Sequence, residues 1–171
     1  TLDVTNERQM EAAISTLIKD FGKIDILVNN AGYGYLAAIE EGENSEVLKL
    51  FETNFFGVLS LTKMVLPHMR AQKSGRIINN SSQAGLMANP GTGYYSATKY
   101  ALEGLMEALA KEIVQFNIYV TNVEPGAFRT DWSGRSMKRS SIEISDYANS
   151  VKNRLDMISN IDGKQPGDPE R

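Results

Sequence analysis

The stretch Ile24-Asp-Ile-Leu-Val-Asn-Asn-Ala-Gly32 (IDILVNNAG) decides the fold class of this 171-residue chain. It is a short apolar run without the apolar–polar alternation of a half-exposed strand. Such a run is typical of a strand in a parallel sheet that is covered on both faces. Two more strand-like runs follow, GRIINNSS at residues 75–82 and IYVTNVEPG at residues 118–126, with long helical patterns between them. Strands that alternate with helices predict an α/β fold with a doubly wound parallel sheet, here as one domain.

Apolar residues at helical spacing locate the helices. Residues 6–22 predict a helix that Gly22 ends, and residues 93–117 predict a long helix. Between these, residues 45–75 read as one long helix with Ser45 as its N-cap and Gly75 at its end. From Thr130 onward the pattern weakens, and we expect residues 130–171 to form a mobile lid over a substrate pocket. The aromatic and apolar residues expected in this lid are Trp132, Met137, Ile142, Ile144 and Tyr147.

Composition excludes several kinds of chemistry. The formal net charge of −3 argues against nucleic acid or an anionic membrane as the main partner. The chain contains no cysteine and one histidine, His68, so thiolate chemistry and a multi-histidine metal site are excluded, and no metal is expected. No run of 18 apolar residues and no signal-peptide pattern occurs, and a cytoplasmic location is expected.

In a doubly wound sheet, ligands bind beyond the carboxyl ends of the strands. Each predicted strand runs into a polar or glycine-containing loop, at residues 29–32, 81–83 and 124–126, so these three loops should line one crevice. The run GYGYLA at residues 32–37 matches a dinucleotide fingerprint, G-x-G-x-x-A. A phosphate loop opens directly into a helix, whereas Glu40, Glu41 and Gly42 interrupt this segment, so we do not interpret it as one.

A tyrosine and a lysine stand at the start of the last long helix. Tyr95 and Lys99 are four residues apart and therefore share one helix face, whereas Tyr94 and Tyr100 do not share it as well. A free tyrosine is nearly all protonated at neutral pH, and a nearby ammonium favours the phenolate and lowers the pKa. Such a tyrosine can exchange a proton with a carbonyl or alcohol oxygen.

Five motifs in order give a family resemblance. They are NNAG at 29–32, NFFG at 54–57, GRIINNSSQAG at 75–85, YSATK at 95–99 and PGAFRT at 125–130, and Ser82 precedes Tyr95 by 13 residues (95 − 82 = 13). The chain resembles the short-chain dehydrogenase/reductase family in its Tyr-x-x-x-Lys form, which has a Rossmann-like sheet. The segment VEPGAFRTDW also resembles the 17β-hydroxysteroid-dehydrogenase-like branch, which acts on steroids and retinoids. The resemblance implies an NAD(P)-dependent oxidoreductase that moves a hydride between nicotinamide and a carbonyl or secondary alcohol.

The resemblance also assigns roles to four side chains. Tyr95 would be the general acid/base at the substrate oxygen, and Ser82 would hold that oxygen and stabilise its developing charge. Lys99 would lower the pKa of Tyr95 and bind the nicotinamide ribose. Asn54 would bend its helix and anchor a water that links to the lysine. Substrate contacts are expected at Ser82, Tyr95 and Trp132.

Cofactor contacts follow from the same resemblance. Asp3 would accept a hydrogen bond from the adenine amino group, the NNAG loop would lie at the adenosine ribose, and the PGAFRT segment would hold the carboxamide. Contacts are expected from Asp3, Val4, Asn30, Ala31, Gly32, Tyr95, Lys99, Pro125, Gly126, Phe128 and Thr130.

Departures from the family pattern lie mainly at the two ends. The glycine-rich T-G-x-x-x-G-x-G turn and the strand that selects NAD or NADP are missing, so either cofactor remains possible. We expect the sheet to be incomplete at the N-terminus and at the C-terminus, which makes residues 1–171 a single partial domain that is inactive alone. Asn80 takes a strand position that is usually apolar in the family.

The residues leave other functions open. A non-catalytic relative could sense a dinucleotide or bind a partner, although it would normally lose part of the tetrad Asn54, Ser82, Tyr95 and Lys99. A lyase or epimerase that uses bound cofactor transiently is a second alternative, and a stoichiometric change in nicotinamide absorbance would discriminate between these classes. The expected substrate is a small molecule, a medium or large hydrophobic ketone or secondary alcohol, and the resemblance implies a homodimer or homotetramer.

Overall fold

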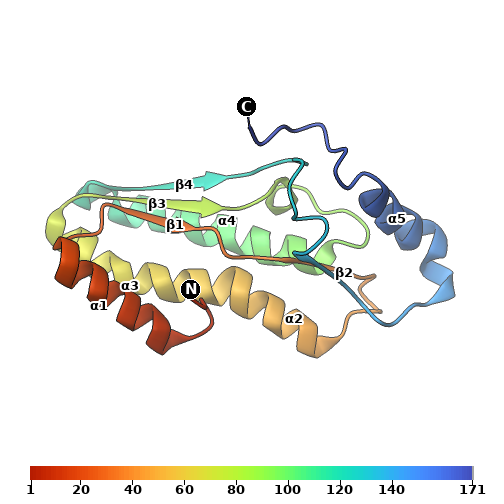
Figure 1. Cartoon of the computed structure of the whole chain (residues 1–171), viewed down its shortest axis with the longest axis horizontal. Helices are drawn as coiled ribbons and strands as arrows, with labels where there is room; N and C mark the ends of the chain where they lie inside the picture. Colours follow the sequence, from red (N-terminus) through yellow and green to blue (C-terminus); the bar gives the residue numbers. More distant parts are fainter. Residues whose placement is uncertain (171) are drawn as a thin grey trace.

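A three-stranded parallel sheet with the strand order β1-β3-β4 forms the centre of the computed structural model, which describes residues 1–170. Three helices, α1, α3 and α4, cover one face of this sheet (Figure 1). The strands are β1 (Ile26–Asn29), β3 (Gly75–Asn80) and β4 (Ile118–Val123). The helices are α1 (Glu7–Phe21), α3 (Gly57–Gln72) and α4 (Gly93–Ile113). This arrangement confirms the predicted α/β fold with a parallel sheet.

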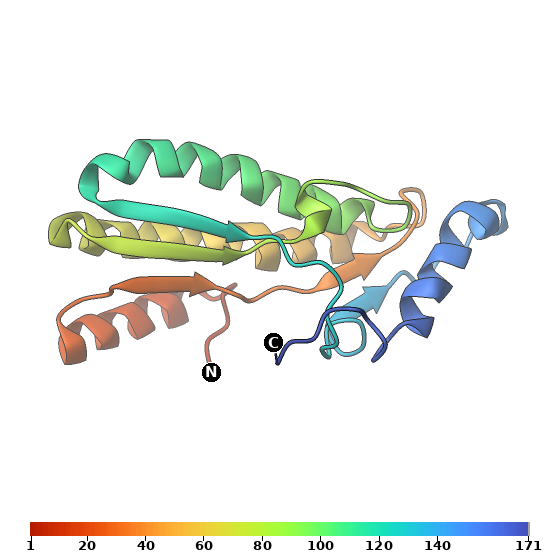
Figure 2. The same cartoon turned by 90° about the horizontal axis from the view of Figure 1, so that it is seen from above.

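All three strands point toward the same end of the molecule (Figure 2). A second, two-stranded parallel sheet lies at that end, where β2 (Gly34–Leu36) pairs with β5 (Met137–Arg139). The last helix, α5 (Asn153–Asn160), also lies beyond the carboxyl ends of the strands (Figure 2). The part of the chain after Thr130 is therefore placed where ligands of such folds bind.

The helical pattern of residues 45–75 forms one continuous helical run that contains a π-helical turn. The helix α2 (Asn44–Phe51) is followed by a π-helical turn at Glu52–Phe56 and then by α3. Glu43 rather than Ser45 occupies the N-cap of α2. At the other end, α3 stops at Lys73, which takes the left-handed conformation (φ 55°), and Gly75 is the first residue of β3. Both predicted helix ends were therefore wrong by about two residues, which is usual where no capping side chain fixes the end.

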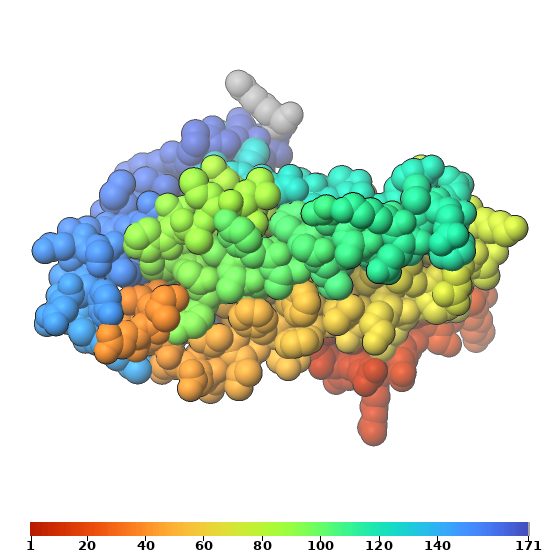
Figure 3. All heavy atoms as spheres, turned by 180° about the vertical axis from the view of Figure 1, so that it is seen from behind, coloured from red at the N-terminus to blue at the C-terminus, as the bar shows by residue number. Residues whose placement is uncertain are grey.

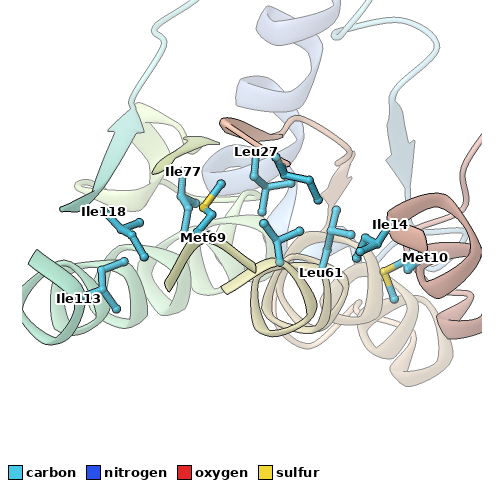
Figure 4. Close-up of a cluster of buried hydrophobic side chains, with 10 residues drawn as sticks. Met10, Ile14, Leu27, Leu61, Met69, Ile77, Ile113 and Ile118 are labelled. Carbon is cyan, nitrogen blue, oxygen red and sulfur yellow. The ribbon is translucent and has the colours of Figure 1, made fainter. Parts of the chain in front are cut away.

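The outer surfaces of α3 (yellow) and α4 (green) lie side by side when the molecule is seen from behind (Figure 3). Their inner faces contact the main core, together with α1 and the sheet (Figure 4). In this core Ile77, Ile118 and Met69 are fully buried. Each such side chain stabilises the fold by about 1.5–3 kcal/mol relative to an exposed one.

The sheet is covered on one face only by the described residues, which corrects the prediction for IDILVNN. Leu27 faces the helices and is buried, whereas Ile26 and Val28 are 57% and 56% exposed. The reason is topological. Successive right-handed crossovers that add strands in one direction place their helices on the same face of the sheet. In addition, β1 is an edge strand that pairs with β3 alone within residues 1–170.

Residues 130–170 form a small unit that packs on β2. Leu36 and Ala38 contact Val151 and Leu155 in a separate apolar cluster. This part of the chain therefore shares a small apolar core with β2 and the residues that follow it. No helix within the described residues is long and apolar enough to cross a membrane.

Candidate active site

The loop after β3 presents Ser82. Its backbone is extended, and its hydroxyl oxygen accepts a hydrogen bond from the Ala84 amide (3.1 Å), which caps the short helical turn Gln83–Gly85. This turn packs on α4, whose first turn carries Tyr95. Tyr95 is 6% exposed, and burial raises its pKa, while a hydrogen bond with Ser82 acts in the opposite direction. The two side chains predicted to act on a substrate oxygen are thus adjacent.

Lys99 lies one turn further along α4 and is 5% exposed. Its Nζ donates to the Asn80 carbonyl oxygen (2.7 Å) and lies 5.7 Å from the centre of the Tyr95 ring. Burial lowers the pKa of Lys99 to about 8, and the Glu103 carboxylate opposes this shift. In this structure burial raises the pKa of Tyr95, and the Lys99 ammonium is directed at a carbonyl, so a lowering of the Tyr95 pKa by Lys99 stays a prediction.

Asn54 is in the π-helical turn and is 1% exposed. Its Oδ1 accepts from the Tyr33 amide (3.0 Å), and its Nδ2 donates to the Tyr33 carbonyl (2.9 Å) and to the Thr98 hydroxyl (3.2 Å). The extra residue of a π-turn is a frequent feature of functional sites. Asn54 therefore connects the loop after β1 to the helix that carries Tyr95 and Lys99.

A cavity of about 580 Å³ opens beside Tyr95. The loops after β3 and β4 line it, as predicted, together with Trp132, whose ring centre lies 5.3 Å from that of Tyr95. The predicted site residues on its wall are Ser82, Tyr95, Pro125, Gly126, Phe128, Thr130 and Trp132. Met137 also lines it. In contrast, Ile142, Ile144 and Tyr147 line a separate cavity of about 310 Å³, and their place in a lid over the substrate pocket stays a prediction.

The loop after β1 meets the cavity wall indirectly. Asn30 accepts a hydrogen bond from Asn80 (2.8 Å), and Asn80 itself lines the cavity. Asn80 is exposed at the end of β3, which explains why a polar residue is tolerated at position 80. A Cβ on Gly32 would lie 3.2 Å from Asn54 Oδ1, so this loop passes close to Asn54. Ala31 lies between Asn30 and Gly32 in the same loop.

Asp3 and Val4 precede α1, away from this cavity. The Asp3 carboxylate accepts from the Thr5 amide and hydroxyl, and these hydrogen bonds lower its pKa. The Val4 carbonyl approaches Gly57 at the start of α3. Neither residue belongs to the cavity lining, so their predicted contact with an adenine ring stays a prediction.

The residues around Tyr95 fit a nicotinamide cofactor. The nearest atom to a Cβ built on Gly126 is Gln83 Oε1 at 3.9 Å, so the backbone after β4 faces open space that a ring could occupy. Tyr95 provides a hydroxyl at the adjacent wall, and the Lys99 ammonium lies outside the cavity lining, 5.7 Å from the centre of the Tyr95 ring.

A sequence profile described as short chain dehydrogenase matches residues 1–140. The chain belongs to this family. A 3-ketodihydrosphingosine reductase of Bacteroides thetaiotaomicron is 42% identical over 158 residues, which cover 92% of this chain and 59% of the relative. Human retinol dehydrogenase 8 is 38% identical over 141 residues, covering 82% of this chain and 44% of the relative.

Solved structures agree with this membership. A short-chain dehydrogenase from Streptomyces avermitilis superposes with a TM-score of 0.90 and 40% identity, over 99% of this chain and 61% of that chain. A gluconate 5-dehydrogenase from Burkholderia cenocepacia, in complex with NADP and tartrate, superposes with a TM-score of 0.74 and 33% identity. The match covers 78% of this chain and 52% of that chain. The chain thus spans between about two fifths and three fifths of these relatives.

Sequence reasoning missed a row of amides beneath this short-chain dehydrogenase site. Asn29 donates to Asn79 (2.8 Å), Asn79 to Asn122 (2.9 Å), and Asn122 to the Glu103 carboxylate (2.5 Å). The three asparagines are register partners on adjacent strands. Their signal was present in the sequence as one asparagine near the end of each strand, and Glu103 follows Lys99 by four residues.

Proposed function

We propose that this chain carries the catalytic groups of an NAD(P)-dependent oxidoreductase that interconverts a carbonyl compound and a secondary alcohol. The observation that carries the proposal is the adjacency of Ser82 and Tyr95 on the wall of one cavity, with Lys99 behind them. Membership in the short-chain dehydrogenase family supports it. The cofactor, when bound, supplies or accepts the hydride at the substrate carbon.

The protein supplies the proton and holds the oxygen. In reduction, the Tyr95 hydroxyl gives its proton to the substrate oxygen while the carbonyl carbon gains a hydride, and the product is the alcohol. The Ser82 hydroxyl can donate to the same oxygen and stabilise its negative charge. Asn54 fixes the position of Tyr33 and Thr98 around this centre. Lys99 would bind the ribose hydroxyl groups beside the nicotinamide.

Burial raises the pKa of Tyr95, which keeps the phenol protonated at neutral pH. A protonated phenol is the form that carbonyl reduction needs, whereas alcohol oxidation needs the phenolate. We therefore expect the reduction rate to fall at high pH and the oxidation rate to rise there.

The substrate we propose has a hydrophobic body. Phe128, Trp132 and Met137 lie on the cavity wall beside Tyr95, and apolar surfaces of this kind favour apolar ligands. A steroid- or retinoid-like compound is one such substrate, and the similarity to human retinol dehydrogenase 8 supports that branch. The bound NADP in the Burkholderia structure supports a nicotinamide dinucleotide as cofactor.

The test compares Tyr95→Phe with wild-type full-length protein across pH, using NADH and NADPH with a panel of ketones. Tyr100→Phe is the matched control, because this substitution removes an equivalent hydroxyl from the same helix. Among the described residues, the Tyr100 hydroxyl donates to the Leu86 carbonyl. We expect Tyr95→Phe to abolish turnover and to retain cofactor binding, while Tyr100→Phe retains both.

Each rival function has its own outcome in this experiment. Dinucleotide binding without turnover of any carbonyl or alcohol by the wild type would favour a sensor or partner-binding protein. Product formation without a net change in nicotinamide absorbance would favour a lyase or epimerase. Turnover that survives in Tyr95→Phe would refute the role proposed for Tyr95. The homodimer or homotetramer and the cytoplasmic location stay predictions.

A further inference from the structure

Arg154 is a cation on the wall of the cavity that contains Tyr95. It lies in α5, which runs past the carboxyl ends of the strands (Figure 2), and it is partly buried. Among the described residues that line this cavity, Arg154 is the one with a charged side chain, and no carboxylate lines it. The cavity wall therefore carries one uncompensated positive charge.

The guanidinium of Arg154 has no partner within residues 1–170. Its Nε is buried without a hydrogen bond, and the described hydrogen bonds and ion pairs do not include its other nitrogens. Leaving a buried donor of a charged group unpaired is costly. Because Arg154 lines an open cavity, a ligand bound there can accept hydrogen bonds from its guanidinium.

Five carboxylates of residues 130–170 have partners other than Arg154. Four of them form ion pairs, in Asp131–Arg135, Glu143–Lys152, Asp156–Arg139 and Asp168–Arg129. In addition, Asp162 accepts from the Gln165 amide. Asp146 and Glu170 take part in none of the described ion pairs, but neither lines the cavity, so no carboxylate of this segment neutralises Arg154 there.

We propose that the substrate has an apolar body that ends in an anionic group, a carboxylate or phosphate, which Arg154 binds while Tyr95 and Ser82 hold the reacting oxygen. This proposal rests on the proposed function and narrows its substrate class. Arginine suits the role because its planar fork can bind either group through two parallel hydrogen bonds. The apolar part of the substrate would lie against Trp132, Met137 and Ile158, which line the cavity.

Trp132 provides a binding assay that does not depend on turnover. It is the single tryptophan of the chain, and it lines the cavity, so its fluorescence reports on ligands there. Decanoate and decyl phosphate are the anionic probes, and decanol is the neutral probe of the same length. We expect both anions, or one of them, to bind wild type at least tenfold more tightly than decanol.

Three variants isolate the arginine. Arg154→Met removes the charge with a similar apolar stem, Arg154→Lys keeps the charge, and Arg135→Met removes an exposed arginine of the same segment as the control. We expect Arg154→Met to weaken anion binding by about tenfold to a hundredfold, the range for a hydrogen bond to a charged group. Arg154→Lys should retain part of the affinity, Arg135→Met should retain all of it, and decanol affinity should not change.

Turnover of an oxo acid against its methyl ester completes the test, with 9-oxodecanoate as substrate. We expect wild type to have a higher kcat/KM for the acid and Arg154→Met to lose that preference. Equal binding of decanoate and decyl phosphate by wild type and Arg154→Met, or equal use of acid and ester by wild type, would overturn the anion site. Failure of wild type to reduce any ketone would instead overturn the proposed function, while Arg154-dependent anion binding would still support the site.

Discussion

Replacing Lys99 by methionine should change how the stability of the protein depends on pH. Lys99 is 5% exposed, and burial lowers the pKa of its ammonium from the ordinary 10.5 to about 8. The folded state therefore holds a charge at neutral pH in a place that disfavours it. Because the folded pKa is the lower one, the unfolded chain binds more protons between these values, and stability rises with pH there.

The size of the effect follows from the two pKa values. Their difference is 2.5 (10.5 − 8), and at 1.36 kcal/mol per pKa unit the charged lysine costs the folded state about 3 kcal/mol below pH 8. That cost is relieved as the pH rises from 8 to 10.5, and about 2 kcal/mol of it disappears between pH 7 and 9.5. The hydrogen bond from Lys99 to the Asn80 carbonyl (2.7 Å) offsets part of this cost at neutral pH. Lys99→Met removes that hydrogen bond, which should destabilise the folded state by about 1–3 kcal/mol.

Urea unfolding of wild type and Lys99→Met at a series of pH values between 7 and 9.5 measures this difference. At pH 7 we expect the free energy of unfolding of Lys99→Met to equal or exceed that of wild type. Between pH 7 and 9.5 the free energy of unfolding of wild type should rise by about 2 kcal/mol relative to that of the variant. Lys63→Met is the control, because Lys63 is exposed on α3 and should give a constant difference. A difference between wild type and Lys99→Met that does not change with pH would refute a lowered pKa for Lys99.

Two further predictions concern glycines and the neighbour of Lys99. Gly57→Ala should destabilise the fold, because a Cβ there would lie 2.7 Å from the Val4 carbonyl oxygen. Gly104 in α4 has open space around it, so Gly104→Ala should raise the free energy of unfolding in urea by about 0.5–1 kcal/mol. Glu103→Gln should lower the pKa of Lys99 further, because the carboxylate raises it, so the pH-dependent gain in stability should begin at lower pH. Destabilisation by Gly104→Ala, or an unmoved pH profile in Glu103→Gln, would contradict these expectations.

Local patterns were enough to predict the strands and the loops after β3 and β4 that line the cavity. Ser82 follows β3, and Tyr95 and Lys99 lie in the first two turns of α4, so the positions of these two elements bring them together. The coverage of the sheet could not be predicted in this way. Ile26 and Val28 are as apolar as Leu27, and only the direction of the crossovers decides which of them faces the helices.

Contacts between distant segments were also beyond local reasoning. The pairing of β2 with β5 joins residues about a hundred positions apart and has no signature in either three-residue strand. Arg154 reaches the cavity through this pairing and through the cluster of Leu36 with Leu155. The raised pKa of Tyr95 is a property of its burial, which spacing along one helix does not reveal.

The row of asparagines links the three strands of the sheet to Glu103 on α4 through side-chain hydrogen bonds. Asn29 and Asn79 are buried, so each amide depends on its neighbours for hydrogen bonds, and a change in register would leave amides unpaired at about 1–3 kcal/mol each. The row ends at Glu103, which also acts on the charge of Lys99. The same amides that hold the strands in register therefore fix the carboxylate beside the lysine, so stability of the sheet edge and protonation of the site depend on common residues.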